Sequence, residues 1–174
     1  IVAGIDALFA TDWYAETDEL LLREVEIPRP VKSSPLDAQV VPSGPGFATE
    51  NNLRMFTTLI YGATDRISLT SPYFVPDESL LYAVTTAAQR GVEVELFVSE
   101  QADQFMVGHA QASYYDVLLE AGVRIYLYPK PTVLHAKHFT VDDDVAVIGS
   151  SNMDIRSFAL DMESSLLVHG RTFV

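Results

Sequence analysis

The sequence predicts a mixed α/β fold in which a largely parallel β-sheet is flanked by helices. Between residues 50 and 129, segments with apolar residues at helical spacing alternate with short apolar segments. Such alternation is typical of strands joined by right-handed helical crossovers, which leave neighbouring strands parallel. After Pro129 the helical segments stop, and apolar stretches joined by short turns predict antiparallel strands added to the same sheet.

Residues 1–35 are expected to form a helix and a connector, followed by a domain over residues 36–174. The helix carries four apolar residues at helical spacing, Ile5, Leu8, Phe9 and Trp13. This pattern indicates a packing helix whose acidic residues face water. Residues 26–35 are rich in proline and serine, which is typical of a connector, and residues 38–44 predict a short strand.

Three helices and three strands are predicted in alternation over the middle of the chain. Their ranges are 52–63, 77–91 and 109–123 for the helices, and 66–74, 92–100 and 124–129 for the strands. Asp77 is expected to cap the second helix at its N-terminus. Gly62, Gly91 and Gly122 stand where the three helices end, and glycine suits the left-handed cap that often closes a helix.

The rest of the chain predicts three further strands, over residues 134–141, 145–152 and 163–170. Side chains alternate between the faces of a strand, so His135 and Lys137 would project together and His138 to the other side. A zinc or iron site built from the two histidines would need both imidazoles on one face, so no metal site is predicted. The three aspartates at 142–144 favour a solvated turn and lack the glycine and distal glutamate of a calcium loop.

Composition limits the possible partners of the chain. Its 174 residues are 48% hydrophobic, which is enough for one core that buries about 70% of the unfolded surface. Eleven basic against 24 acidic residues give a net charge of -13, which repels polyanions, so no nucleic-acid partner is expected. Cysteine is absent, which excludes disulfides. No apolar stretch reaches the roughly 18 residues of a membrane span, so the chain is expected to be soluble. It begins within an apolar stretch at Ile1 and ends at Val174 without a polar tail, so it is expected to be a piece of a longer protein.

The segment from residue 134 to residue 152 holds the strongest functional signal. It contains the pattern H-x-K-x4-D, then six intervening residues and G-S-x-N, which together resemble the HKD signature of the phospholipase D superfamily. The segments NMDIRSFALDME, SPYFVPDESLL and LFATDWYAET are similar to segments of bacterial cardiolipin synthases, in the order of the C-terminal half of such an enzyme. Only one HKD motif is present. Its fixed positions are His135, Lys137, Asp142, Gly149, Ser150 and Asn152.

The resemblance implies cleavage of a phosphodiester in two steps, without a metal or another cofactor. One motif histidine attacks phosphorus to form a phosphohistidine, and the histidine of a second motif protonates the leaving oxygen. The partner that supplies the second motif would be the missing N-terminal half or a second copy of this chain. In chains with two motifs the N-terminal histidine is usually the nucleophile, so His135 would be the general acid and then the base.

The resemblance also assigns roles to the residues around His135. Lys137 and Asn152 would hold the non-bridging oxygens of the phosphate, as a point charge and a neutral donor. Gly149 and Ser150 would provide close backbone approach and a hydroxyl donor. Glu163 would accept a hydrogen bond from the other ring nitrogen of the histidine, which fixes its tautomer.

Five further residues have structural roles or two alternative roles. The resemblance makes Asp142 a structural residue near the turn and not a phosphate contact. Arg156 either binds an anionic headgroup or forms a salt bridge, and Ser157 caps or turns the chain. Tyr73 and Phe74 either line the substrate cleft or pack in the core.

The leading function implied is phosphatidyl transfer between two phosphatidylglycerol molecules, which gives cardiolipin and glycerol. The alternatives are hydrolysis of a lipid or nucleic-acid phosphodiester, or an inert half domain that only binds phosphate. The strong negative charge ranks a nuclease lower. The full-length enzyme would work at the bacterial cytoplasmic membrane, and this half alone, with one motif, would have negligible activity.

Overall fold

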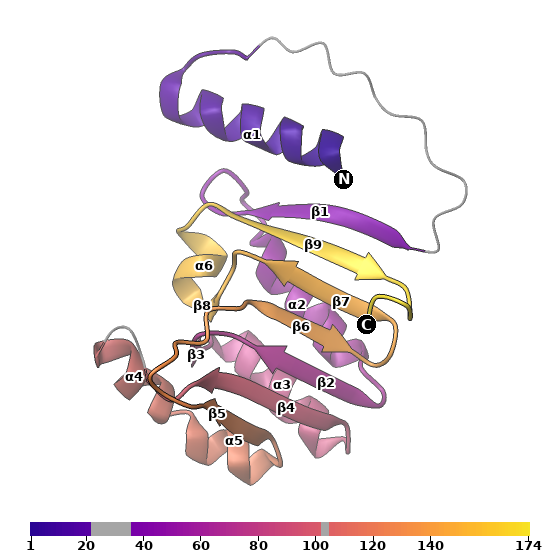
Figure 1. Cartoon of the computed structure of the whole chain (residues 1–174), viewed down its shortest axis with the longest axis vertical. Coiled ribbons are helices and arrows are strands. Elements are labelled where there is room, and N and C mark those ends of the chain that lie inside the picture. The colour runs from indigo at the N-terminus through magenta and orange to yellow at the C-terminus, as the bar shows by residue number, and fades with distance from the viewer. Residues whose placement is uncertain (22–35, 102–104) are drawn as a thin grey trace.

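The computed structural model describes residues 1–21, 36–101 and 105–174. Its main feature is a seven-stranded sheet in the order β1-β9-β7-β6-β2-β4-β5 (Figure 1). These strands are Asp37–Ser43 (β1), Arg66–Thr70 (β2), Glu93–Ser99 (β4), Arg124–Tyr128 (β5), His138–Val141 (β6), Val145–Gly149 (β7) and Glu163–His169 (β9). A separate two-stranded ribbon pairs Phe74–Val75 (β3) with Met153–Asp154 (β8). The helices are Val2–Thr17 (α1), Asn51–Gly62 (α2), Glu78–Gln89 (α3), Phe105–Ala112 (α4), Tyr115–Ala121 (α5) and Ile155–Ala159 (α6).

The sheet is mixed, which confirms the predicted α/β class. Among the described strands of the seven-stranded sheet, the parallel pairs are β2 with β4 and β4 with β5, which helical crossovers connect. The pairs β1–β9, β9–β7, β7–β6 and β6–β2 are antiparallel. The prediction of a largely parallel sheet is therefore wrong. The antiparallel strands expected after Pro129 are present as β6, β7 and β9, and β1 adds a further antiparallel strand at the edge.

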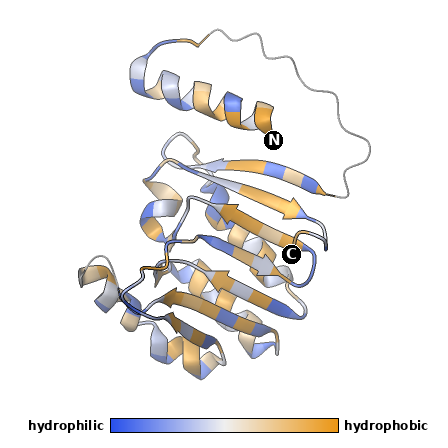
Figure 2. Cartoon of the chain, viewed as in Figure 1, coloured by the Kyte–Doolittle hydropathy of each residue, from blue (hydrophilic) through white to orange (hydrophobic). Residues whose placement is uncertain are grey.

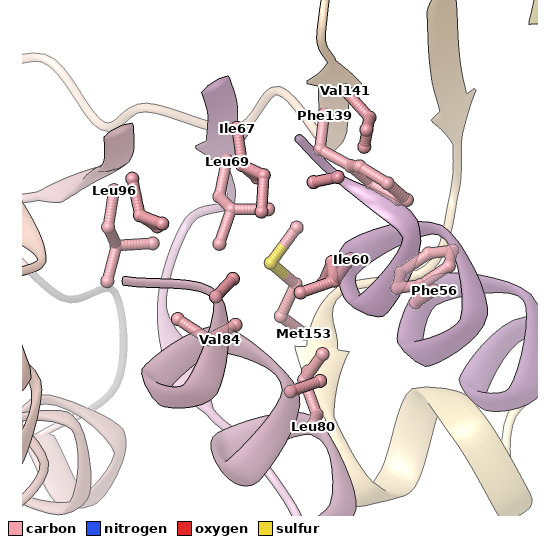
Figure 3. Close-up of a cluster of buried hydrophobic side chains, with 14 of the residues drawn as sticks. Phe56, Ile60, Ile67, Leu69, Leu80, Val84, Leu96, Phe139, Val141 and Met153 are labelled. Carbon is pink, nitrogen blue, oxygen red and sulfur yellow. The ribbon is translucent and has the colours of Figure 1, made fainter. Parts of the chain in front are cut away.

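The core lies between the sheet and the helices α2, α3 and α5, which cover its rear face in Figure 1. Figure 3 shows Phe56 and Ile60 of α2 and Leu80 of α3 pointing toward the buried side chains of β2, β4 and β6. The Phe56 ring meets Phe139 edge-on, with ring centroids 4.8 Å apart, and Phe158 at 5.6 Å. These contacts fix α2 against α6 and against β6, which follows the first half of the HKD motif.

Most predicted helix ends are confirmed. The Asp77 carboxylate caps α3 by accepting from the backbone N–H groups of Ser79 and Leu80, at 3.3 and 3.0 Å. Gly91 and Gly122 follow α3 and α5 with φ of 94° and 98°, where a side chain would be strained.

The prediction of a left-handed cap at Gly62 is wrong. Gly62 is the last residue of α2, and the chain leaves through Ala63 at φ −59° and ψ 139°. The Arg90 guanidinium donates to the carbonyl oxygens of Tyr61 and Ala63, at 2.6 and 3.0 Å. A distant side chain therefore binds one carbonyl in the last turn of α2 and one just beyond it.

Three predicted elements are shorter than expected. The strand over 66–74 is interrupted around Pro72, which has no N–H to offer a neighbouring strand, and it divides into β2 and β3. The helix over 109–123 divides into α4 and α5. The strand over 134–141 begins only at His138, so the first half of the HKD motif precedes it.

The N-terminal helix α1 is confirmed, but it does not pack as expected. No side chain of α1 is buried, and Ile5, Phe9 and Trp13 are 53%, 48% and 38% exposed. The helix lies beside β1 in Figure 1, with Gly4 close to Val40, and Figure 2 shows hydrophobic residues along it. The predicted connector over 26–35 lies outside the described residues. Across the described ranges, none of the helices combines the length and apolar character needed to cross a bilayer.

Candidate active site

His135 and Lys137 lie in the irregular segment that leads into β6. The Lys137 Nζ lies 3.3 Å from Nδ1 and 3.4 Å from Nε2 of His135, and it donates to the His135 carbonyl oxygen at 3.1 Å. The expectation that they share a strand face is wrong, because regular pairing starts one residue after Lys137. The ammonium and the imidazole nevertheless form one exposed pair, while His138 is the first residue of β6.

Two contacts fix the segment that carries this pair. The buried Ser99 hydroxyl, at the carboxyl end of β4, accepts from the Leu134 backbone N–H at 2.7 Å. On the other side, the Gly149 N–H donates to the Lys137 carbonyl oxygen at 3.1 Å. The pair therefore lies beyond the carboxyl end of a parallel strand, where open α/β sheets usually bind ligands. Sequence reasoning missed Ser99, since nothing local to β4 signals this contact.

Ser150 and Glu163 form a second group beside Lys137. The Ser150 hydroxyl donates to the Glu163 carboxylate and also accepts from the Ser164 N–H at 3.0 Å. Burial raises the pKa of Glu163, while hydrogen bonds from Ser150 and Ser157 and the positive charge of Lys137 lower it in part. Among the described residues, no hydrogen bond joins Glu163 to His135, so the carboxylate does not orient the ring in this structure.

Gly149 allows β7 and β9 to approach closely beside this group. A Cβ atom at this position would lie 2.5 Å from the Ser164 carbonyl oxygen and 2.9 Å from the Ser165 Cα. Both are backbone atoms of β9, so they cannot move aside as a flexible side chain could. The strand spacing that places Ser150 against Glu163 therefore requires glycine at 149.

Asn152 and Tyr73 form a third group, brought together by the β3–β8 ribbon. The Asn152 Nδ2 donates to the Tyr73 hydroxyl at 3.0 Å. The Asn152 Oδ1 is buried and has no hydrogen-bond partner among the described residues. No hydrogen bond within the described ranges links Asn152 to His135 or Lys137, and the short segment from Gly149 to Asn152 connects the groups. Phe74 is buried in the core, which is the second of the two roles considered for it.

The helix α6 begins at Ile155, three residues after Asn152. The buried Asp154 carboxylate caps the helix by accepting from the Ser157 N–H at 2.9 Å and from its hydroxyl at 3.3 Å. Ser157 is thus the capped residue and not the cap. The Arg156 side chain is 73% exposed, with Nη2 3.9 Å from the Asp161 carboxylate. Sequence reasoning missed Asp154, although D-x-x-S is a usual pattern at a helix start.

Asp142 anchors the turn between β6 and β7. Its φ is 52°, and its carboxylate accepts from the N–H groups of Thr64, Asp65 and Arg66 at 2.8 to 3.1 Å. Burial alone raises the pKa of Asp142. The hydrogen bonds from these backbone donors and from the Thr64 hydroxyl lower it by more, so the pKa lies below its ordinary value. The third motif residue therefore joins the turn to β2.

Together these groups offer an imidazole, an ammonium and a neutral amide within one connected segment. An imidazole can attack phosphorus or carry a proton, and the other two can stabilise charge on phosphate oxygens. Over the part of the chain that the structure describes, no three histidine, aspartate or glutamate side chains form a metal-binding group.

Comparison with known proteins gives cardiolipin synthases as relatives over nearly the whole chain. A cardiolipin synthase of Halalkalibacterium halodurans is 38% identical over 170 residues, which are 97% of this chain and 34% of the relative. A cardiolipin synthase A of Serratia proteamaculans is 38% identical over 171 residues, which are 97% of this chain and 35% of the relative. The chain thus spans about a third of the length of these curated relatives.

Solved structures share the fold at low sequence identity. Nuc of Salmonella typhimurium, a phospholipase D family member, has a TM-score of 0.66 and 18% identity over 79% of this chain and 86% of its own. The phosphatidylserine synthase of Haemophilus influenzae has a TM-score of 0.61 and 21% identity over 91% of this chain and 39% of its own. The model of the phospholipase D-like domain of cardiolipin synthase matches residues 56–174, which confirms the resemblance inferred from the HKD motif. This chain belongs to the family of phospholipase D-like domains of cardiolipin synthase.

Proposed function

We propose that this chain supplies one of two half-sites of an enzyme that converts two phosphatidylglycerol molecules to cardiolipin and glycerol. The observation that carries the proposal is the contact of the Lys137 ammonium with both ring nitrogens of His135, within the family motif. The names of the relatives support the same activity. The other half-site would come from the preceding half of a longer chain or from a second copy.

The proposed reaction has two displacements at one phosphorus atom. In the first, a histidine nitrogen attacks phosphorus, the bond from phosphorus to the glycerol oxygen breaks, and the glycerol leaves with a proton from the opposite histidine. In the second, a hydroxyl oxygen of another phosphatidylglycerol attacks the phosphorus, the bond from phosphorus to the histidine nitrogen breaks, and the opposite histidine takes the hydroxyl proton. We assign His135 to the proton transfers in both steps. The new phosphodiester keeps the energy of the old one.

Asn152 is suited to donate to a non-bridging phosphate oxygen. Of its two amide atoms, Nδ2 donates to the Tyr73 hydroxyl, whereas Oδ1 is buried and has no partner among the described residues. Turning the amide by half a rotation exchanges these atoms, and the Tyr73 hydroxyl then donates to Oδ1. The N–H group is then the unpaired one, at a cost of about 1–3 kcal/mol that a phosphate oxygen would remove. Lys137 would hold the same phosphate as a fixed positive charge.

Glu163, Ser150 and Gly149 have positioning roles in this proposal. The Glu163 carboxylate is close enough to Lys137 for an electrostatic effect, so it would hold the ammonium near His135. Ser150 would fix the carboxylate, and Gly149 would keep β7 and β9 close enough for that contact. Asp142 would act on the fold and not on the phosphate.

We further propose that residues 36–174 form the catalytic half domain and residues 1–35 a helix and connector outside it. The substrate is a phospholipid, so the full-length enzyme would work at the bacterial cytoplasmic membrane. The net charge of -13 disfavours a nucleic-acid partner.

The decisive experiment compares His135→Ala with His138→Ala in the full-length protein that contains this chain. We expect His135→Ala to lower cardiolipin synthesis by about 10²–10⁴-fold, because proton transfer contributes on that scale. His138→Ala changes the neighbouring histidine on β6 and should leave synthesis nearly intact. Equal effects of the two changes on labelled phosphatidylglycerol would end the proposal, and phosphatidate as sole product would point to hydrolysis.

A further inference from the structure

An apolar groove of about 270 Å³ lies between α4, β3 and the start of α6. Figure 1 shows these three elements along the left side of the sheet. The walls of the groove include Tyr73, Val75, Val107, Ala110, Ile155 and Arg156. Its size is close to the lower limit of typical ligand sites, and such sites are usually lined by apolar side chains with a few polar groups.

Hydrogen bonds hold the walls of this groove together. Gln111 of α4 is 4% exposed, and its Oε1 accepts from the Phe74 N–H at 3.0 Å while its Nε2 donates to the Tyr115 hydroxyl at 2.6 Å. In the ribbon, Val75 pairs with Asp154, whose carboxylate is already engaged by the N-terminus of α6. The charge of Asp154 is therefore compensated within the fold, and the groove remains mainly apolar.

The groove exposes large apolar side chains on a strongly acidic protein. Ile155 is 55% exposed and Met106, also in the lining, is 82% exposed. A contiguous apolar surface of this kind usually marks a binding site. The polar groups at its border are the Tyr73 hydroxyl and the exposed Arg156 guanidinium.

Tyr73 connects the groove to the candidate active site. Its side chain lines the groove, and its hydroxyl accepts from the Asn152 amide at 3.0 Å. In a phosphatidyl group, one glycerol unit joins the phosphate to both acyl chains. A chain that leaves a phosphate held by Asn152 would therefore pass Tyr73 and enter the groove, with Arg156 near the anionic end.

We propose that this groove binds an acyl chain of the phosphatidyl group whose phosphate lies at His135, Lys137 and Asn152. This inference rests on the proposed function and adds to it a site for the apolar part of the substrate. A nucleobase fits less well, because Val75, Val107, Ala110 and Ile155 form aliphatic walls and the net charge of -13 repels a polyanion.

The first test fills the groove in the full-length protein with Ala110→Trp and uses Ala112→Trp as the matched control. Both residues lie on α4, but Ala112 is exposed and is not part of the lining. The kcat/KM is measured for dioleoyl phosphatidylglycerol in mixed micelles and for glycerophosphoglycerol, which has no acyl chain. We expect Ala110→Trp to lower the kcat/KM of the acylated substrate relative to that of glycerophosphoglycerol by about tenfold or more. Each lost methylene contact weakens binding about fourfold. The control should keep the wild-type ratio.

A second variant guards against a folding defect in Ala110→Trp. Ile155 is half exposed, so Ile155→Asn changes the polarity of the wall without inserting a bulky group into the fold. It should lower the same ratio by about fourfold, the effect of one methylene. Equal losses on both substrates, or no loss on the acylated one for either variant, would overturn the inference.

Photocrosslinking separates this inference from the proposed function. Phosphatidylglycerol with a diazirine on one acyl chain is irradiated with the wild-type protein, and the labelled peptides are located by mass spectrometry. Label on Val107, Ala110 or Ile155 supports the groove even if the protein makes no cardiolipin, a result that would end only the proposed function. Cardiolipin synthesis with the label confined to other regions would end only the groove.

Discussion

Glu163 is the ionisable residue of the site for which the fold changes the acid–base behaviour most directly. Burial raises the pKa of its carboxyl group, and the hydroxyls of Ser150 and Ser157 compensate only in part. Relative to the unfolded chain, folding therefore shifts the balance of this group toward the protonated form. A raised pKa contributes stability that is fully present below the ordinary value of 4.5 and is lost as the pH rises through the folded value.

The variant Glu163→Gln should consequently gain stability relative to wild type as the pH rises from about 4 to about 7. The amide of the variant cannot ionise, so it avoids the cost of a buried charge at neutral pH. Urea unfolding across this pH range measures the difference in unfolding free energy. Glu120→Gln, on an exposed position of α5, is the control and should run parallel to wild type. Parallel curves for Glu163→Gln as well would show that burial does not shift this group.

Among the secondary-structure elements, the contact between β7 and β9 is the least tolerant of change. We expect Gly149→Ala to lower the unfolding free energy by about 1–3 kcal/mol, because the added methyl group meets the backbone of Ser164 and Ser165. Gly46→Ala is the matched control, since a Cβ atom there meets nothing within 4 Å, and its effect should stay within about 0.5 kcal/mol. Thermal or urea unfolding measures both. Similar stabilities for the two variants would contradict the close approach of the strands.

The elements that were predictable from the sequence are those fixed by local contacts. Asp77 caps α3 through N–H groups two and three residues away, and Gly122 closes α5 with its own backbone, so short patterns suffice. The end of α2 is different, because Arg90 reaches carbonyls 27 and 29 residues earlier in the chain. The break at Pro72 and the cap at Asp154 had local signals that the hydrophobic pattern concealed.

The difference between local and long-range contacts also explains which parts of the candidate site were predictable. His135 and Lys137 are two residues apart, so their proximity was predictable even though the strand geometry was not. Tyr73 and Asn152 are 79 residues apart, and only the β3–β8 ribbon brings them together. The partners of Glu163 depend on the spacing of β7 and β9, which the motif alone does not determine.

For the whole molecule, the proposed function makes this single HKD motif one half of a two-histidine site. We expect the 174-residue chain as a monomer to turn over phosphatidylglycerol at least about a hundredfold more slowly than the full-length protein, because a catalytic proton donor or nucleophile is missing. Light scattering after size exclusion establishes the monomer, and labelled lipid measures turnover in the same fractions. Repeated turnover by a strictly monomeric fraction would show that one motif is sufficient.

The strand β1 lies at the edge of the sheet and, among the described strands, pairs only with β9, so the two ends of this pair can separate to different extents. Its first residue, Asp37, lies opposite His169, while its last, Ser43, lies opposite Glu163. Asn51 donates to the Pro42 carbonyl and Ser43 hydrogen-bonds with the Asn52 N–H, so the end beside Glu163 is held from α2 as well as from β9. Edge strands fray more readily than central ones. We therefore expect this edge to open from Asp37 and to reach Glu163 last, because the Glu163 end is held from two sides.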